Sequence, residues 1–220
     1  MKRITVIALA LIFTMPIAGC SNNSEEFTAQ SYVSEDTEIT AVNIDVRDRA
    51  IEVALSADNQ VHIDYFESEK ESYNILVSDD RALTMTAADS KDWTDYIGGK
   101  SSAGARKIVL QIPDSLLSAL TLSTTNDDIQ LSELSVQGDI SLSTNGGNIV
   151  FDKVDVGNTI NLTAKNGSIE GTIVGGYDDF AISCDIKKGD CNLPTDKRNG
   201  AKTLNISNNN GDVAVEFAGN

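Results

Sequence analysis

Cys184 and Cys191 are the residues of this chain whose types and spacing point to the most specific chemistry. Two thiols held close together in an oxidising compartment form a disulfide, which stabilises a short loop by about 2–3 kcal/mol. The alternative is that both remain free thiols and pack as small hydrophobic side chains. The sequence predicts the disulfide and leaves the free pair as the second interpretation.

Acid–base and metal chemistry find little support. His62 is the only histidine, and it lies between two apolar residues of an alternating run, so we expect its side chain to face water. A Ser–His–Asp or Cys–His set cannot be assembled, and a site with several histidine ligands is excluded. Acidic residues instead gather at expected turns: Asp127, Asp128, Asp178, Asp179 and Asp212. We therefore predict no catalytic residue, no cofactor and no metal, with calcium at the corners and hydrolysis by paired acids as minor alternatives.

A segment rich in aromatic and acidic residues is the candidate binding loop. Asp92, Trp93, Asp95 and Tyr96 lie in an insertion, residues 87–106, that interrupts the strand pattern. Aromatic side chains on a loop can contact a sugar or a protein partner. Alternatively, Trp93 and Ile97 cover an open end of the fold, because repeat structures need caps.

The elements that must position these residues follow a twenty-residue period. Equivalent apolar residues recur in two columns: Leu120, Ile140, Ile160, Phe180, and Leu122, Leu142, Leu162, Ile182. Two further columns place the cysteines: Thr124, Thr144, Ala164, Cys184, and Ile129, Ile149, Ile169, Cys191. Because so short a unit cannot bury its own apolar face, successive units must stack. We expect both sulfurs to face the interior across one corner.

The period predicts an all-β, single-stranded parallel β-helix (β-solenoid) with about twenty residues per coil in the C-terminal half. Each coil contains short strands, as in residues 120–124, 129–131 and 134–136, joined by corners rich in Asn, Gly and Asp. These residues tolerate left-handed backbone, and stacked Asn side chains can form a ladder. The last coil restores the columns at Leu204 and Val213 after four extra residues. Residues 38–112 alternate less regularly, and either coils or an antiparallel cap would explain them.

The first nineteen residues have the pattern of a secretory signal. Lys2 and Arg3 precede a short apolar stretch, and the segment before Cys20 resembles the lipobox of bacterial lipoproteins. This resemblance implies cleavage before Cys20 and lipid attachment to its sulfur, which gives stable membrane anchoring. We divide the chain into a signal peptide (1–19), a lipidated cysteine with a flexible tether (20–37) and a folded domain (38–220).

The net charge of −16 restricts the partners. Loss of Lys2 and Arg3 with the signal peptide lowers the charge to −18. So acidic a surface repels nucleic acid and anionic lipid, and we expect no nucleic-acid partner.

From about Thr37 to Phe217 the chain resembles the bacterial "putative adhesin" family of envelope domains. The resemblance rests on residues 108–113 (IVLQIP), the Asn-Gly-Asx corners, residues 177–180 (YDDF), 192–194 (NLP) and 210–213 (NGDV). It implies a β-solenoid, right-handed as parallel strand connections usually are, and it brings no catalytic motif. We expect a non-enzymatic binding or adhesion module, lipid-anchored on the extracytoplasmic side, with an envelope protein or glycan as partner. The alternatives are an envelope-stress sensor or scaffold working with a membrane partner and, less favoured, a polysaccharide-acting enzyme.

Overall fold

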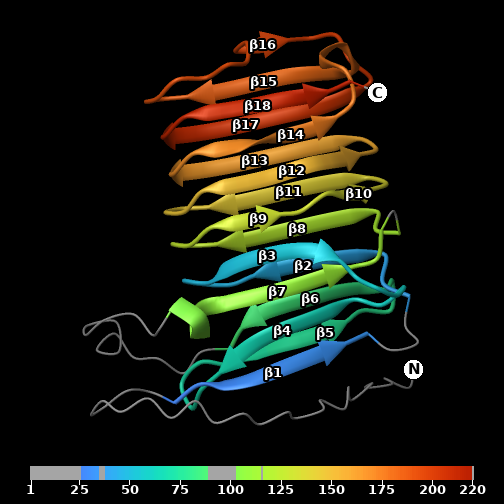
Figure 1. Ribbon diagram of the computed structural model, residues 1–220, viewed down its shortest axis with the longest axis vertical. Helices are drawn as coiled ribbons and strands as arrows, with labels where there is room; N and C mark the ends of the chain where they lie inside the picture. Colours follow the sequence, from blue (N-terminus) through green and yellow to red (C-terminus); the bar gives the residue numbers. More distant parts are fainter. Residues whose placement is uncertain (1–25, 35–37, 89–102, 115, 220) are drawn as a thin grey trace.

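The computed structural model describes residues 26–34, 38–88, 103–114 and 116–219, and in these ranges the chain is built from β-strands (Figure 1). The helical elements of the described residues are two 3-10 turns, η2 (Ala103–Arg106) and η3 (Tyr177–Asp179). Neither is long and apolar enough to cross a bilayer. The predicted all-β class is confirmed.

The strands form two mixed sheets of nine strands each. In spatial order, sheet A contains β1 (Thr28–Val33), β4 (His62–Glu67), β7 (Lys107–Ile112), β3 (Ala50–Leu55), β9 (Ile129–Leu131), β12 (Ile149–Val156), β14 (Ile169–Val174) and β18 (Val213–Ala218), with β10 (Leu134–Val136) paired to β12. Sheet B contains β16 (Asp196–Lys197), β15 (Phe180–Ile186), β17 (Lys202–Asn210), β13 (Thr159–Asn166), β11 (Asp139–Thr144), β8 (Ala119–Thr124), β2 (Ala41–Asp45), β6 (Ala82–Ala87) and β5 (Tyr73–Val77). Four pairs are antiparallel, β1–β4, β4–β7, β5–β6 and β15–β16, and the other pairs are parallel.

The middle of the molecule follows the predicted columns. We call a sheet B strand and the sheet A strand after it one winding. Leu142 pairs with Leu122 on one side and with Leu162 on the other, and Ile149 pairs in the same way with Ile129 and Ile169. All are buried, because alternate residues of each strand point into the space between the sheets. The apolar alternation of the sequence therefore fixes both the strands and their register.

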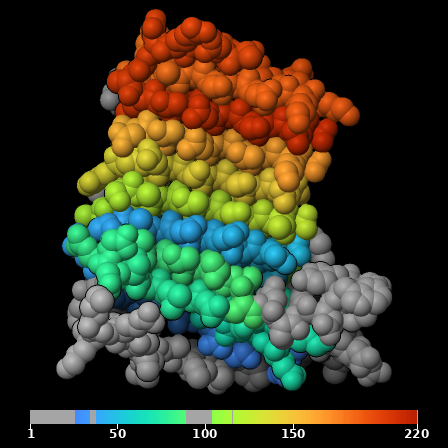
Figure 2. All heavy atoms as spheres, turned by 180° about the vertical axis from the view of Figure 1, so that it is seen from behind, coloured from blue at the N-terminus to red at the C-terminus, as the bar shows by residue number. Residues whose placement is uncertain are grey.

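At the C-terminal end the windings are not stacked in chain order. Strand β17 lies between β13 and β15, and β18 pairs directly with β14. Figure 2 shows this as a red layer beneath the orange layer at the end of the molecule. The expectation that the winding beginning at Phe180 follows the one at Ile160 is wrong, because Ile160 pairs with Leu204. A repeat period identifies equivalent residues, but it does not identify which copies are neighbours.

The register of β15 also differs from the predicted one by two residues. Ile182 pairs with Leu204 and Cys184 with Ile206, so Cys184 belongs to the column of Leu162 and not to that of Ala164. The shift places the buried Phe180 ring beside the Phe217 ring, with centroids 5.5 Å apart, at the edge of the core. Aromatic packing at this edge offers a physical reason for the offset.

At the N-terminal end the two alternatives left open by the sequence both apply. Strands β2 and β3 continue the parallel columns next to β8 and β9, and β6 and β7 lie beyond them. Antiparallel β5, β4 and β1 then complete this end. Thr28–Val33, assigned to the tether from the sequence, is strand β1, which pairs along its whole length with β4 and covers the edge of that strand.

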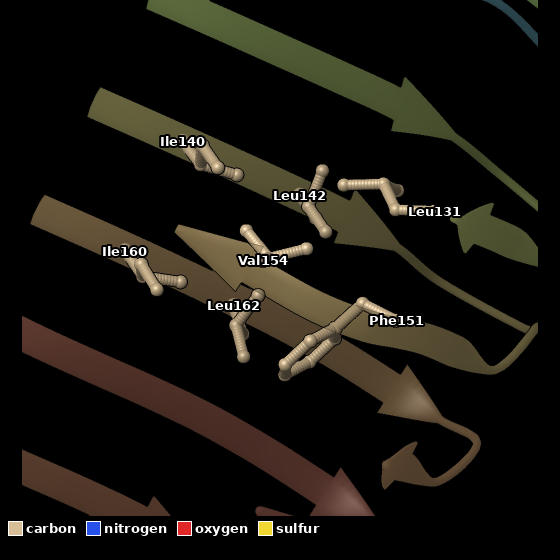
Figure 3. A pocket seen from close by; sticks show the side chains of 7 residues that line it. All are labelled: Leu131, Ile140, Leu142, Phe151, Val154, Ile160 and Leu162. Carbon is tan, nitrogen blue, oxygen red and sulfur yellow. The ribbon is translucent and has the colours of Figure 1, made fainter. Parts of the chain in front are cut away.

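The interior between the sheets is a continuous apolar core. Figure 3 shows side chains from both sheets pointing toward one another around a small gap lined by Leu131, Ile140, Leu142, Phe151, Val154, Ile160 and Leu162. The gap is too narrow to admit a water molecule. Phe151 is accommodated because its neighbour is Gly171, where a Cβ atom would lie 2.4 Å from the phenyl ring. This part of the interior is packed as a core and offers no room for a ligand.

The corner after the sheet B strands depends on close backbone contact. A Cβ atom on Gly147 would lie 2.0 Å from the carbonyl oxygen of Asp127, and one on Gly167 would lie 2.0 Å from that of Gly147. These two glycines are therefore required by the close approach of neighbouring windings rather than by left-handed backbone. Beside them, the Asn148 amide N–H donates to Asp128 (2.7 Å) and the Asn148 side-chain oxygen accepts from the Ser168 N–H (2.9 Å). This is an Asx ladder of the expected kind.

One buried ion pair lies in the N-terminal half. Arg49, which follows the β2–β3 corner, pairs with Glu71, and their side chains are only 4% and 5% exposed. Arg49 Nε also donates to the Tyr73 hydroxyl at 2.6 Å, and the Arg49 carbonyl oxygen accepts from the Thr124 hydroxyl at 2.8 Å. The pair thus connects the corner, the β5 strand and the first winding of the central stack.

Candidate functional site

Several residues singled out from the sequence lie outside the described ranges. These are Cys20 with the preceding signal segment, and the binding-loop residues Asp92, Trp93, Asp95 and Tyr96. The anchor, the domain boundary at 19 and the aromatic loop all stay predictions, whereas β1 places residues 28–33, expected in the tether, within sheet A.

The structure does bring Cys184 and Cys191 together. Their sulfur atoms lie 2.9 Å apart as free thiols, with Cys184 buried in β15 and Cys191 bridged to Val213 at the end of sheet A. Burial, and then the contact with Cys191, raise the pKa of the Cys184 thiol to about 12. Cys191 lies in the predicted column, because Val213 pairs with Ile169. The disulfide itself stays a prediction.

The two thiols should differ in reactivity. We expect protein isolated without reductant to be two hydrogens lighter at this pair. After reduction under native conditions, Cys191 should be alkylated before Cys184, because burial raises the pKa of the Cys184 thiol and so lowers its thiolate fraction, and because Cys191 is the less buried of the two. Mass spectrometry of peptides at successive times measures both rates. Equal rates in the folded chain would contradict this assignment, and unfolded chain provides the control.

The histidine and the acidic corners do not form a reactive cluster. His62 Nε2 lies 2.9 Å from Asp58 Oδ1, and this hydrogen bond is the main cause that lowers the pKa of Asp58. Within the part of the chain that the structure describes, no three His, Cys, Asp or Glu side chains are grouped so that they could hold a metal ion. The corner carboxylates have structural partners instead: Asp128 and Asp212 accept from the backbone N–H groups of Asn148 and Asp190, Asp179 accepts from that of Gly176, and Asp127 pairs with Arg106.

The outer surface of sheet B carries an ordered set of polar side chains that the sequence reading did not identify. In each of four adjacent strands, β8, β11, β13 and β17, the two residues that flank the central inward side chain point outward. We call these eight residues the polar face: Thr121, Ser123, Ser141, Ser143, Asn161, Thr163, Asn205 and Ser207. All are exposed or half-buried. The parallel register aligns them in two columns, one through Ser141 and the other through Ser143.

The polar face is uncharged, although the chain has a net charge of −16. The column through Ser143 reaches Asp45 on β2 and Asp185 on β15, whereas the column through Ser141 continues to Asn43 and Ser183. The corresponding outer positions of sheet A are different, since Glu52 and Glu170 lie in the same column as Val150. Charge is therefore absent from the two columns of the polar face, although Asp139 and Lys165 lie at the next outward positions of β11 and β13.

Hydroxyl and amide groups dominate this face, and each can both donate and accept hydrogen bonds. Two of these side chains are hydrogen-bonded to each other, because Asn205 Nδ2 donates to Asn161 Oδ1 at 2.9 Å. The signal was present in the sequence as a polar–apolar–polar triplet repeated without charge, for example Thr121-Leu122-Ser123 and Ser141-Leu142-Ser143. The chemistry available here is reversible hydrogen bonding to a ligand.

A second feature, at the C-terminal end, is an aromatic cluster beside η3. The Tyr177 side chain is 43% exposed, and its ring meets Phe217 edge-on at 5.6 Å. Lys197 Nζ lies 4.8 Å from the centre of the Tyr177 ring and donates to the Phe180 carbonyl oxygen at 2.7 Å. These contacts give the cluster a structural role in closing the end of the core.

Comparison with solved structures identifies similar folds at low sequence identity. A "putative cell adhesion protein" from Clostridium sporogenes superposes with a TM-score of 0.63 at 11% identity, covering 89% of this chain and 100% of that chain. A "putative adhesin" from Bacteroides fragilis gives a TM-score of 0.36 at 11% identity, covering 89% and 98%. A "putative lipid binding protein" from Parabacteroides distasonis gives 0.26 at 9% identity, covering 87% and 95%.

Sequence comparison gives the family. No curated protein matches the chain. The family model described as Toastrack DUF4097 matches residues 39–217, which is nearly the range over which the sequence resembles envelope adhesin domains. With that model spanning most of its 220 residues, the chain belongs to the Toastrack DUF4097 family, whose fold is β-solenoid-like.

Proposed function

We propose that this protein is a lipid-anchored, non-enzymatic binding module on the extracytoplasmic side of the bacterial envelope, and that the polar face is its ligand surface. The observation that carries the proposal is the set of eight uncharged, outward-facing residues in a chain of charge −16. A solubilising surface needs no such exclusion of charge, whereas a surface that must lose its water to a neutral partner does, because desolvated charges are costly.

Three further observations support the address and the class. The signal-like segment ends at Cys20, the described residues contain no metal-binding cluster, and a fold relative carries the name of a putative cell adhesion protein. We also infer that the windings from β8 to β14 form a single right-handed parallel β-helix, which agrees with the usual hand of parallel connections. In such a helix the two columns of the polar face stay aligned along the axis.

The test compares two substitutions in one winding, made in the full chain. Ser143→Lys places a charge at the centre of the polar face, and Val150→Lys places the same charge on the opposite face, where Val150 is 40% exposed. We expect Ser143→Lys to weaken binding to isolated envelope material by about tenfold or more, since an unpaired charge in an interface costs 1.4 kcal/mol or more. Val150→Lys should bind like the unmodified chain.

Thermal melting checks that both variants are folded. A third variant, Ser143→Thr, keeps a hydroxyl group and adds no charge, so it should bind far better than Ser143→Lys. Equal binding by the Ser143→Lys and Val150→Lys proteins would remove the polar face from the proposal. Cys20→Ala should move the chain from the membrane fraction to the soluble fraction; its retention in the membrane fraction would contradict the lipid anchor.

A further inference from the structure

The polar face has a repeat in one direction. Neighbouring strands in a sheet are about 4.8 Å apart, and the two outward residues of one strand are about 6.6 Å apart. The paired polar positions of the four strands therefore give two parallel rows about 14 Å long, with one pair of uncharged side chains at each step. A ligand that matches this surface must itself present polar groups at regular steps along a line.

The side-chain chemistry restricts the class of that ligand. No Lys or Arg lies among the eight residues. The nearest outward charges on these strands, Lys165 and Asp139, are opposite in sign, so the face has no net positive charge to neutralise a phosphate or carboxylate, and the negative chain repels anions at longer range. A cation would find carboxylates on the opposite face, at Glu52 and Glu170. The face also lacks the Trp, Tyr and Arg residues that anchor most protein interfaces.

The ligand class that remains is a neutral molecule rich in hydroxyl groups. Ser, Thr and Asn side chains donate and accept at the same time, and so do the hydroxyls of a sugar. An extended chain of sugar rings advances by about one strand spacing per ring, so that each ring can meet one strand of sheet B. The structure also limits the length over which both columns are uncharged, because the column through Ser143 reaches Asp45 at one end and Asp185 at the other.

Building on the proposed function, we propose that the polar face binds an uncharged, linear polysaccharide extended along the stacking axis, with one sugar residue on each strand from β8 to β17. Binding is then a sum of similar small contributions, and it depends on the number of consecutive rings. Each ring that gains a net hydrogen bond raises the affinity by about two- to tenfold. The gain ends once the paired polar positions of all four strands are occupied.

The experiment measures the affinity of the full chain in detergent for β-1,4-linked glucose and N-acetylglucosamine oligosaccharides of one to eight units. We expect affinity to rise with length up to about four units and then to level off. A carboxymethylated oligosaccharide of the same length should bind at least about tenfold more weakly, because its charges meet an acidic chain. Ser143→Lys should flatten the length dependence, while Val150→Lys on the opposite face should retain it.

The outcomes separate this inference from the proposed function. If neutral oligosaccharides of every length fail to bind, while Ser143→Lys still abolishes envelope binding, the polar face is a binding surface for another partner and the polysaccharide assignment is wrong. An affinity that does not depend on length contradicts the axial arrangement. If the unmodified chain does not bind envelope material at all, the proposed function fails first.

Discussion

Removing residues 201–220, which deletes β17 and β18, is expected to release β15 as well, although β15 precedes the deletion. The cause is the order of strands in sheet B, where β17 lies between β13 and β15. The deletion removes four buried aliphatic side chains, Leu204, Ile206, Val213 and Val215. At about 1.5–3 kcal/mol each, this loss of about 6–12 kcal/mol is comparable to the whole stability of a typical domain, about 5–15 kcal/mol.

Hydrogen exchange of the amides of β15, or proteolysis between residues 180 and 197, measures the effect. In the truncated chain the β15 amides should exchange as in an unfolded segment, while removal of residues 219–220 alone should leave them protected. Retained protection of β15 in the shorter chain would mean that this strand can pack directly on β13, which is the arrangement expected from the twenty-residue period. The two orders of stacking therefore predict opposite results.

The second large effect concerns the buried ion pair. We expect Glu71→Gln to lower the free energy of unfolding by about 3–5 kcal/mol, because Arg49 would keep its charge in a site that is 4% exposed. Arg49 would also lose part of the contact that holds it beside Tyr73. Denaturant unfolding followed by circular dichroism gives the difference between the two proteins.

A matched control is available on the surface of the same half. Arg81 pairs with Glu38 at 2.5 Å, but the side chains are 50% and 66% exposed. Glu38→Gln should therefore change the free energy of unfolding by less than about 1 kcal/mol. Similar losses from Glu71→Gln and Glu38→Gln would show that burial does not govern the Arg49–Glu71 pair.

The central windings could be predicted closely from the sequence. Leu122, Leu142 and Leu162 recur at exact intervals, with polar residues on either side, and this pattern allows only one inward set. The corners were predictable for the same reason, although the need for Gly147 and Gly167 comes from the approach of the neighbouring backbone. Period and alternation are local properties, and they translate directly into register.

The two ends could not be predicted in this way. Nothing in the residues around Phe180 or Leu204 specifies which strand contacts Ile160, because both have the same apolar alternation. Burial of Arg49 and Glu71 was hidden as well, since each looks like a turn residue in the chain. Their pairing depends on strands that are distant in sequence.

The candidate site was missed for a different reason. Trp93 and Tyr96 stand out in the sequence because aromatic side chains are frequent in binding sites, whereas the polar face consists of common small side chains. Thr121, Ser141 and Asn161 become distinctive only when the parallel register places them side by side. The pattern that carries the signal is a lack of charge at the paired positions of four adjacent strands, β8, β11, β13 and β17.

The out-of-order strands at both ends have a consequence for how such molecules change length during evolution. At the C-terminal end β17 lies between the earlier strands β13 and β15, and at the N-terminal end β7 lies between the earlier strands β4 and β3. Extra units therefore cannot be added at either end without disrupting this strand order. Duplication is compatible with the fold only in the interior, where residues 139–158 form a self-contained unit between two like neighbours. Each added copy would lengthen the protein by about 4.8 Å along the stacking axis, so that its length can change in equal increments.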